Sequence, residues 1–161
     1  MYFPSNILDE QSRIWIYQSD RELLPEEKSV LSSELKIFID QWTAHNKELK
    51  GSFEILLDRF LIIMIDETNT NATGCSIDKS MNFIKQMEIK LNVNFTNRLE
   101  LAYKEGNEIK TISKSSFEDK LKSGQFNENT IVFNNLIEKK SELNSHWQVA
   151  VKESWHKMML N

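Results

Sequence analysis

The strongest constraint on the fold is the continuous apolar run from Phe60 to Ile65. Six residues are far too few to cross a membrane, but they suit a strand that is buried on both faces of a sheet. The segment SFEILLD precedes this run with almost no spacer, which predicts a tight hairpin of two antiparallel strands. We therefore expect a sheet whose central strand is doubly covered.

Two amphipathic helices are predicted to cover this sheet. The first begins at Pro25, because proline suits the first turn of a helix, and it ends near His45–Asn46. Apolar residues at helical spacing form one stripe on each helix. The stripes are Leu31, Leu35, Phe38 and Trp42 on the first helix, and Ile77, Met81, Ile84, Met87 and Leu91 on the second.

Alternating residues predict further strands on both sides of this unit. RIWIYQS begins at Arg13, RLELAYK follows the second helix, and a short strand is expected at 108–112. The resulting order, β-α-β-β-α-β, is the split βαβ or ferredoxin-like order of an α+β fold. It predicts an antiparallel sheet with two helices on one face, and a larger mixed sheet is the alternative.

The chain length suggests a single domain spanning residues 1–161. We expect an N-terminal arm at 1–12, an α/β core at 13–112 and a C-terminal appendage at 113–161 that packs on the core. In the appendage, Ser115 and Glu118 form a capping-box pattern before a short helix at 117–122. Gly124 is expected to end that helix, and TIVF is expected to form a strand.

Composition excludes several kinds of partner. The net charge is −4 and the chain has only four arginines, so nucleic-acid binding is not expected. A single cysteine cannot form an internal disulfide, which favours a reducing, cytoplasmic location. The N-terminus lacks the basic and apolar pattern of a signal peptide, and no membrane span is predicted.

Cys75 is the sharpest candidate for chemistry, because it stands where the polar loop after the central strand gives way to a helix. A thiol at a helix N-terminus is favoured in its reactive thiolate form, and a nearby histidine such as His45 or His156 would be needed as the base. The alternative, which we favour, is structural: Cys75 is a small residue at a tight junction, and Gly74 supplies a positive φ or a close approach.

Two other groups of side chains are candidate binding residues. Asp66 and Glu67 end the central strand and Asp78 lies beyond the loop, so their carboxylates could converge on a ligand. The spacing matches no known metal motif, and no metal is predicted. In the tail, Trp147 and Trp155 could form a pocket wall or an interaction surface, although covering the sheet is the simpler role.

Nucleotide-binding motifs are missing from the sequence. None of the four glycines precedes lysine, and no two are close enough for G-x-G-x-x-G, so no nucleotide cofactor is predicted. Three segments, DQWTAHNKELKGSFEI, IDETNTNATGCSID and ESWHKMM, resemble a family of small uncharacterised bacterial proteins often labelled "ABC transporter ATPase". That resemblance implies no functional residues, and the label conflicts with the missing P-loop.

The sequence therefore predicts a small non-enzymatic binding or protein-interaction module. Its partner is a protein or a small molecule, and a homodimer through the sheet edge or the aromatic tail is one form of this hypothesis. The alternative is a thiol-dependent enzyme or a redox-responsive protein that uses Cys75 with a nearby histidine.

Overall fold

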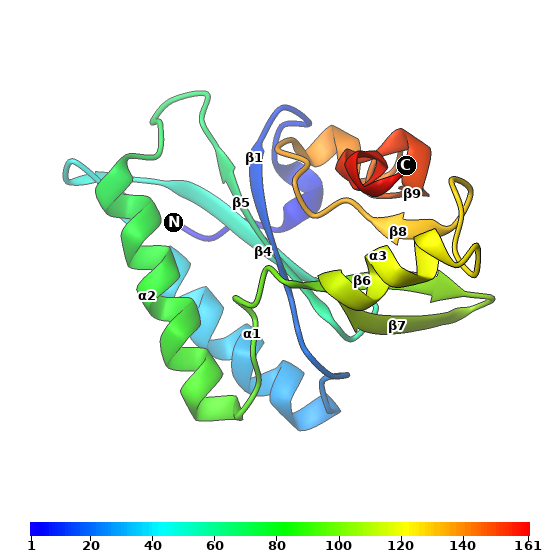
Figure 1. Ribbon diagram of the computed structural model, residues 1–161. Helices are drawn as coiled ribbons and strands as arrows, with labels where there is room; N and C mark the ends of the chain where they lie inside the picture. The colour runs from blue at the N-terminus through cyan, green and yellow to red at the C-terminus, as the bar shows by residue number, and fades with distance from the viewer. The chain divides into compact units, whose positions relative to one another are not determined.

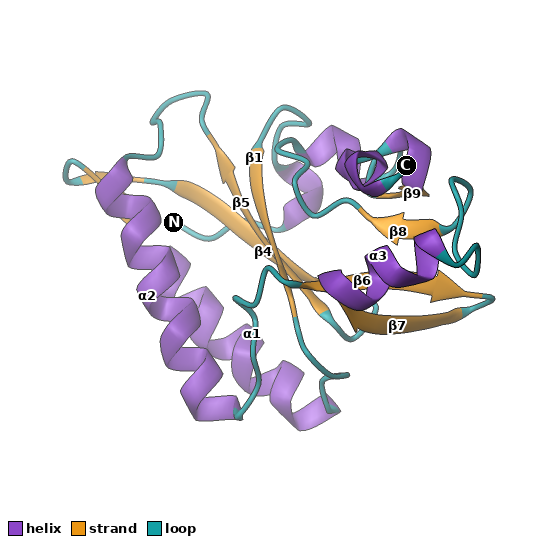
Figure 2. Cartoon of the chain, in the orientation of Figure 1, coloured by secondary structure: helices purple, strands orange, loops and turns teal.

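A computed structural model describes residues 1–161 (Figure 1). The chain forms two compact units, one of Met1–Thr96 with Glu138–Lys140 and the other of Asn97–Ile137 with Ser141–Asn161. Helices and antiparallel strands occur in both (Figure 2), so the predicted α+β class is confirmed. That the chain is a single domain stays a prediction.

The first unit contains two long helices and five strands. They are β1 (Arg13–Gln18), α1 (Pro25–Asp40), β2 (Thr43–Ala44), β3 (Lys47–Glu48), β4 (Lys50–Leu56), β5 (Phe60–Asp66) and α2 (Gly74–Leu91). The second unit contains β6 (Glu100–Glu105), β7 (Glu108–Ser113), α3 (Lys114–Lys122), β8 (Ile131–Phe133) and β9 (Gln148–Ala150). Short 3₁₀ helices lie at Ser5–Ile7, Lys140–Leu143, Val151–Glu153 and Trp155–Met159. None of the helices combines the length and the apolar character needed to cross a membrane.

The main sheet of the first unit has the strand order β1-β5-β4, and both pairings are antiparallel. Every residue of β5 is buried, as the continuous apolar run predicts. The predicted hairpin between β4 and β5 is also confirmed. Its turn places Leu57 and Asp58 at φ values of 55° and 54°, a left-handed conformation that leucine rarely adopts.

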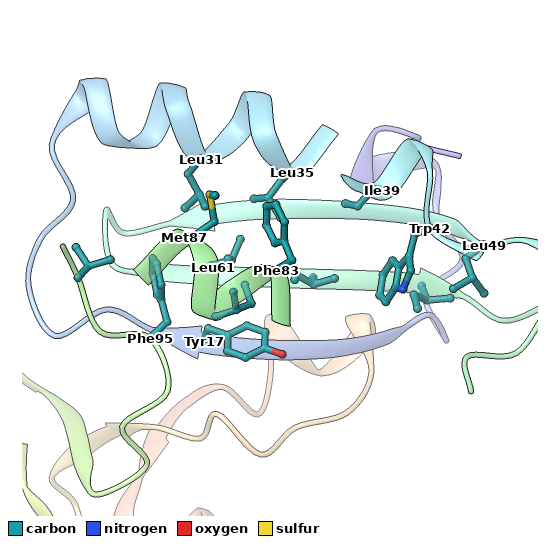
Figure 3. Packing of buried hydrophobic residues seen from close by; sticks show 14 of the residues in the cluster. Tyr17, Leu31, Leu35, Ile39, Trp42, Leu49, Leu61, Phe83, Met87 and Phe95 are labelled. Atoms are coloured by element: carbon teal, nitrogen blue, oxygen red, sulfur yellow. The ribbon is translucent and has the colours of Figure 1, made fainter. Parts of the chain in front are cut away.

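Helices α1 and α2 pack on one face of this sheet (Figure 3). The sheet side of the core includes Leu61, Ile63 and Ile65, which alternate along β5 and so share a face. The helices contribute Leu31, Leu35 and Ile39 from α1 and Phe83, Ile84 and Met87 from α2. Trp42 is 2% exposed, and its indole Nε1–H donates to the Ser76 carbonyl at 2.8 Å.

The ferredoxin-like order is not confirmed, because the predicted fourth strand is missing from this sheet. That strand is β6, which pairs with β7 and β8 in a separate sheet. The β6–β7 hairpin closes locally at Gly106, whose φ is +63°, and local pairing costs little loop-closure entropy. The outer edge of β1 pairs with residues 138–140 instead.

The end of the first helix was also predicted wrongly. Helix α1 ends at Asp40, and His45 and Asn46 form the turn of the β2–β3 hairpin. Both turn residues have positive φ, 48° and 63°, and asparagine tolerates this conformation better than most residues. Trp42 continues the apolar spacing of the helix but lies beyond it.

The second unit has a four-stranded sheet with the order β7-β6-β8-β9. Its core contains Tyr103, Phe117, Phe126 and Val132. Helix α3 is capped by Ser113, whose Oγ accepts from the Ser116 N–H at 3.2 Å, and not by Ser115 as predicted. Gly124 follows the helix at φ +77°, as expected for a residue that ends it.

Candidate functional site

The segment around Cys75 forms the first turn of α2. Thr73 is the N-cap, and its Oγ1 accepts from the Ser76 N–H at 3.2 Å. The Ser76 hydroxyl in turn accepts from the Thr73 N–H at 2.7 Å. This reciprocal pair caps the helix end, and Thr73 is the capping acceptor.

Cys75 is exposed, and the interpretation that it fills a tight junction is wrong. Gly74 has no positive φ, and a Cβ added there would meet nothing within 4 Å. Neither residue is therefore required by packing or by backbone conformation. The side-chain cap of the helix is formed by Thr73 and Ser76.

The structure gives the two candidate histidines different environments. His45 is exposed in the β2–β3 turn of the first unit. His156 is buried in the second unit, where its Nδ1 lies 2.6 Å from the Ser154 hydroxyl and its ring stacks on Trp155 at 4.0 Å. Burial lowers the pKa of His156 to about 4, so this imidazole is neutral at pH 7.

The three candidate carboxylates have separate environments. Asp66 is buried and forms an ion pair with Lys50 at 2.7 Å. Burial alone would raise the pKa of Asp66, but the hydrogen bonds from Lys50 and Thr68 outweigh this effect and hold it at about 2. Glu67 accepts from the Ala72 N–H at 2.8 Å, and Asp78 is exposed on α2. No group of three or more His, Cys, Asp or Glu residues could hold a metal ion.

The two candidate tryptophans pack within the second unit. Trp147 is buried, its Nε1–H donates to the Asn135 side chain at 3.0 Å, and its ring lies 5.3 Å from that of Phe133. Trp155 is half-buried against the ring of His156. These contacts fit a structural role for both residues.

A different feature, the outer edge of β4, is the strongest candidate site. The N–H of Gly51 donates to the Met1 carbonyl at 3.0 Å, and the Phe3 N–H donates to the Gly51 carbonyl at 2.9 Å. Tyr2 therefore pairs with Gly51 as a short parallel strand. The pairing stops at Pro4, after which the chain forms the 3₁₀ helix at Ser5–Ile7.

Beyond Gly51 the same edge is unpaired. Backbone groups of alternate residues in a strand point the same way, so the N–H and C=O groups of Phe53 and Ile55 also point away from β5. These groups have no hydrogen-bond partner. Four polar backbone groups in succession therefore lack a hydrogen-bond partner; we call this stretch, Phe53–Ile55, the free edge of β4. The 3₁₀ helix at Ser5–Ile7 contacts β4 beside it, so a strand added here would displace that helix.

The side chains of the free edge have two different surroundings. Phe53 and Ile55 are half-buried against the core that includes α1, and the ring of Tyr2 lies 5.7 Å from that of Phe53. Glu54 points to the opposite face, where its carboxylate accepts a hydrogen bond from the Ser5 hydroxyl. The free edge thus presents an apolar side and an acidic side.

Sequence reasoning named the sheet edge as a dimer surface but did not identify these residues. The signal was present in the contrast between two adjacent segments. The residues SFEI alternate polar with apolar, whereas the segment from Phe60 to Ile65 is continuously apolar. Alternation is typical of a strand with one exposed face and continuity of a strand covered on both faces, so the contrast favours β5 over β4 as the central strand.

Comparison with known proteins gives no family assignment. No protein family, curated protein or solved structure matches the chain. The resemblance to the bacterial family labelled "ABC transporter ATPase" stays a prediction.

Proposed function

We propose that this protein is a non-enzymatic interaction module that binds an extended peptide segment by strand addition at the free edge of β4. The observation that supports this function is the unpaired state of the outward N–H and C=O groups of Phe53 and Ile55. An exposed row of such groups is a template for pairing with another chain. Strand addition is a recurring mode of peptide recognition.

The geometry of β4 suits this role because the strand is already held in place. Its other side pairs with β5 over seven residues, from Lys50↔Asp66 to Leu56↔Phe60. The added segment would therefore find its hydrogen-bonding groups preorganised, which reduces the entropic cost of binding. Each new backbone hydrogen bond contributes a net stabilisation of about 0.5–1.5 kcal/mol.

The N-terminal residues support the proposal by example. Tyr2 already pairs with Gly51 along the same edge, so an extended segment is compatible with the backbone of β4 and with α1 at that position. The proposal includes a cytoplasmic location, which the single cysteine suggests. Segments of other folded or unfolded proteins would be the potential ligands there.

The first test is amide hydrogen exchange on the free protein. The amides of Phe53 and Ile55 should exchange fast, whereas those of Ser52, Glu54 and Leu56, which point to β5, should be protected. Protection of Phe53 and Ile55 in the free protein would contradict an open edge.

The second test is selection of peptides from a displayed library of extended sequences. Selected peptides should protect the Phe53 and Ile55 amides, and Ile55→Pro should abolish binding because proline removes an outward N–H. Ile55→Ala is the matched control, since it shortens the side chain but keeps the N–H. Peptides that bind Ile55→Pro as well as the native protein would contradict the proposal.

The second candidate function is a thiol-responsive protein, favoured by the exposure of Cys75 in the first turn of α2. It is tested by the rate of alkylation of the native protein with iodoacetamide, compared with that of glutathione. A rate at least about tenfold above that of glutathione would support a tuned thiol. An equal rate would leave Cys75 as an ordinary surface residue.

A further inference from the structure

We infer that the segment added to β4 comes from another protein and carries a lysine or arginine between two apolar residues, with the basic side chain opposite Glu54. This inference rests on the proposed function and specifies its ligand. Two observations support it. One face of the free edge is apolar and the other carries Glu54, and a second copy of this chain would pair with the edge in unfavourable registers.

The apolar positions follow from Phe53 and Ile55. In an added strand, residues that lie opposite these two share their face of the sheet, whichever direction the strand runs. That face is apolar, with Phe53, Ile55 and Tyr2 packed against the core. Apolar or β-branched residues at both positions would extend this surface.

The basic position follows from Glu54. The backbone groups of Glu54 point to β5, so a residue opposite it across the free edge forms a non-hydrogen-bonded pair. In antiparallel strands such pairs bring side chains closest together. A lysine or arginine there faces a carboxylate, and an acidic residue there is destabilising.

A second copy of the chain fits this edge poorly. Two copies related by a two-fold axis pair antiparallel, and the register that uses all four free groups places Phe53 opposite Ile55. That register also places the Glu54 carboxylates of the two copies opposite each other. Like charges in this position are destabilising.

The other symmetric registers use only half of the free groups. Placing Ile55 opposite Ile55 brings Phe53 to Leu57, which lies in the left-handed turn. Placing Phe53 opposite Phe53 brings Ile55 to Gly51, whose outward groups already bond Met1 and Phe3. Charge and register therefore favour a foreign segment over a second copy.

The test uses two acetylated and amidated peptides, Thr-Val-Lys-Val-Thr and Thr-Val-Glu-Val-Thr, titrated into the full-length protein and followed by amide chemical shifts of Phe53 and Ile55. The native protein should bind the lysine peptide about fivefold or more tightly than the glutamate peptide. Glu54→Lys should reverse the preference, and Glu54→Gln should abolish it. Glu128→Lys, an identical charge change in the second unit, should leave the preference unchanged.

The outcomes separate this inference from the proposed function. Equal binding of both peptides, lost in Ile55→Pro, would overturn the inference and leave the proposed function standing. Failure of both peptides and of any library peptide to bind would overturn the proposed function itself. A concentration-dependent dimer in sedimentation velocity, lost in Ile55→Pro, would also overturn the inference, because a second copy would then occupy the edge.

Discussion

The two edges of the β1-β5-β4 sheet are covered by different segments and to different extents. On β1, the Ile14 N–H donates to the Glu138 carbonyl and the Lys140 N–H donates to the Ser12 carbonyl, both at 2.9 Å. This segment runs antiparallel to β1, whereas Met1–Phe3 runs parallel to β4. Both edges thus gain a short added strand from a distant part of the chain.

The difference lies in how much of each edge remains open. On β1, Ile16 is the only outward-facing residue between the stretch paired with residues 138–140 and Gln18. Gln18 has interactions of its own. Its cover is also anchored by Lys140, whose Nζ lies 2.8 Å from the Leu8 carbonyl and 2.7 Å from Glu10. On β4, two successive outward positions stay free. Covering an edge is the general defence against unwanted pairing, so the uncovered stretch of β4 is the part of this sheet on which the proposed strand addition depends.

Replacing isoleucine with proline should change the free energy of unfolding differently on the two edges. Ile14 and Ile55 both point their N–H groups outward, but only that of Ile14 has a partner. Ile14→Pro should lower the free energy of unfolding by about 1–3 kcal/mol more than Ile14→Ala, because the Glu138 carbonyl loses its donor and proline strains a covered strand. This adds to the roughly 2–5 kcal/mol expected for truncating a buried isoleucine.

The corresponding difference on the open edge should be near zero. Ile55→Pro and Ile55→Ala should have similar urea midpoints, since the Ile55 N–H bonds nothing in the free protein. A proline penalty at Ile55 as large as that at Ile14 would show that the outward amide of β4 is already used.

Gly51 tests how closely the covered half of β4 packs against α1. A Cβ at this position would lie 2.9 Å from Ile39 Cγ2 and 3.3 Å from the Met64 carbonyl. Gly51→Ala should therefore cost about 1–3 kcal/mol through overpacking between the strand and α1. Thermal or urea unfolding measures this loss.

Gly74→Ala is the control for a glycine without close neighbours. It begins α2 with open space around its Cα, so alanine should be neutral or stabilise the protein by up to about 1 kcal/mol. Equal losses at Gly51 and Gly74 would mean that close packing of β4 against α1 is not the cause.

A pH dependence is expected at the covered end of β4, where Lys50 pairs with Asp66. The pKa of Asp66 is about 2 in the folded protein, below the value of about 3.9 for an unfolded chain. Its contribution to stability is therefore complete above about pH 4 and is lost as the pH falls toward 2. Unfolding curves of the native protein and Asp66→Asn should converge over that range, and a constant gap would contradict this assignment.

Much of the first unit could be predicted from its sequence because its signals are local. The buried run at Phe60–Ile65, the hairpin before it and Pro25 at the start of α1 were all confirmed. Spacing alone misled at Trp42, which continues the stripe of α1 but packs from a separate segment. Helical period cannot show where a helix ends when the next apolar residue also reaches the core.

Pairing between distant segments could not be predicted. Nothing in the composition of Glu138–Lys140 shows that it adds to β1, or that β6 then joins another sheet. The candidate site had the same difficulty, because an open edge is defined by which partners are missing. Cys75 and His156 attracted interest as reactive residue types, but their exposure and burial depend on tertiary packing.

The cover on β1 has a consequence for synthesis of the protein in the cell. Ile14 leaves the ribosome long before Glu138 and Lys140 exist, and chain growth at about 5–20 residues per second imposes a delay of roughly 6–25 s. During that interval the nascent sheet has an uncovered β1 edge as well as its free β4 edge. A holdase that recognises extended backbone should therefore bind a released chain truncated before residue 138 more tightly than the full-length chain, in which residues 138–140 cover β1.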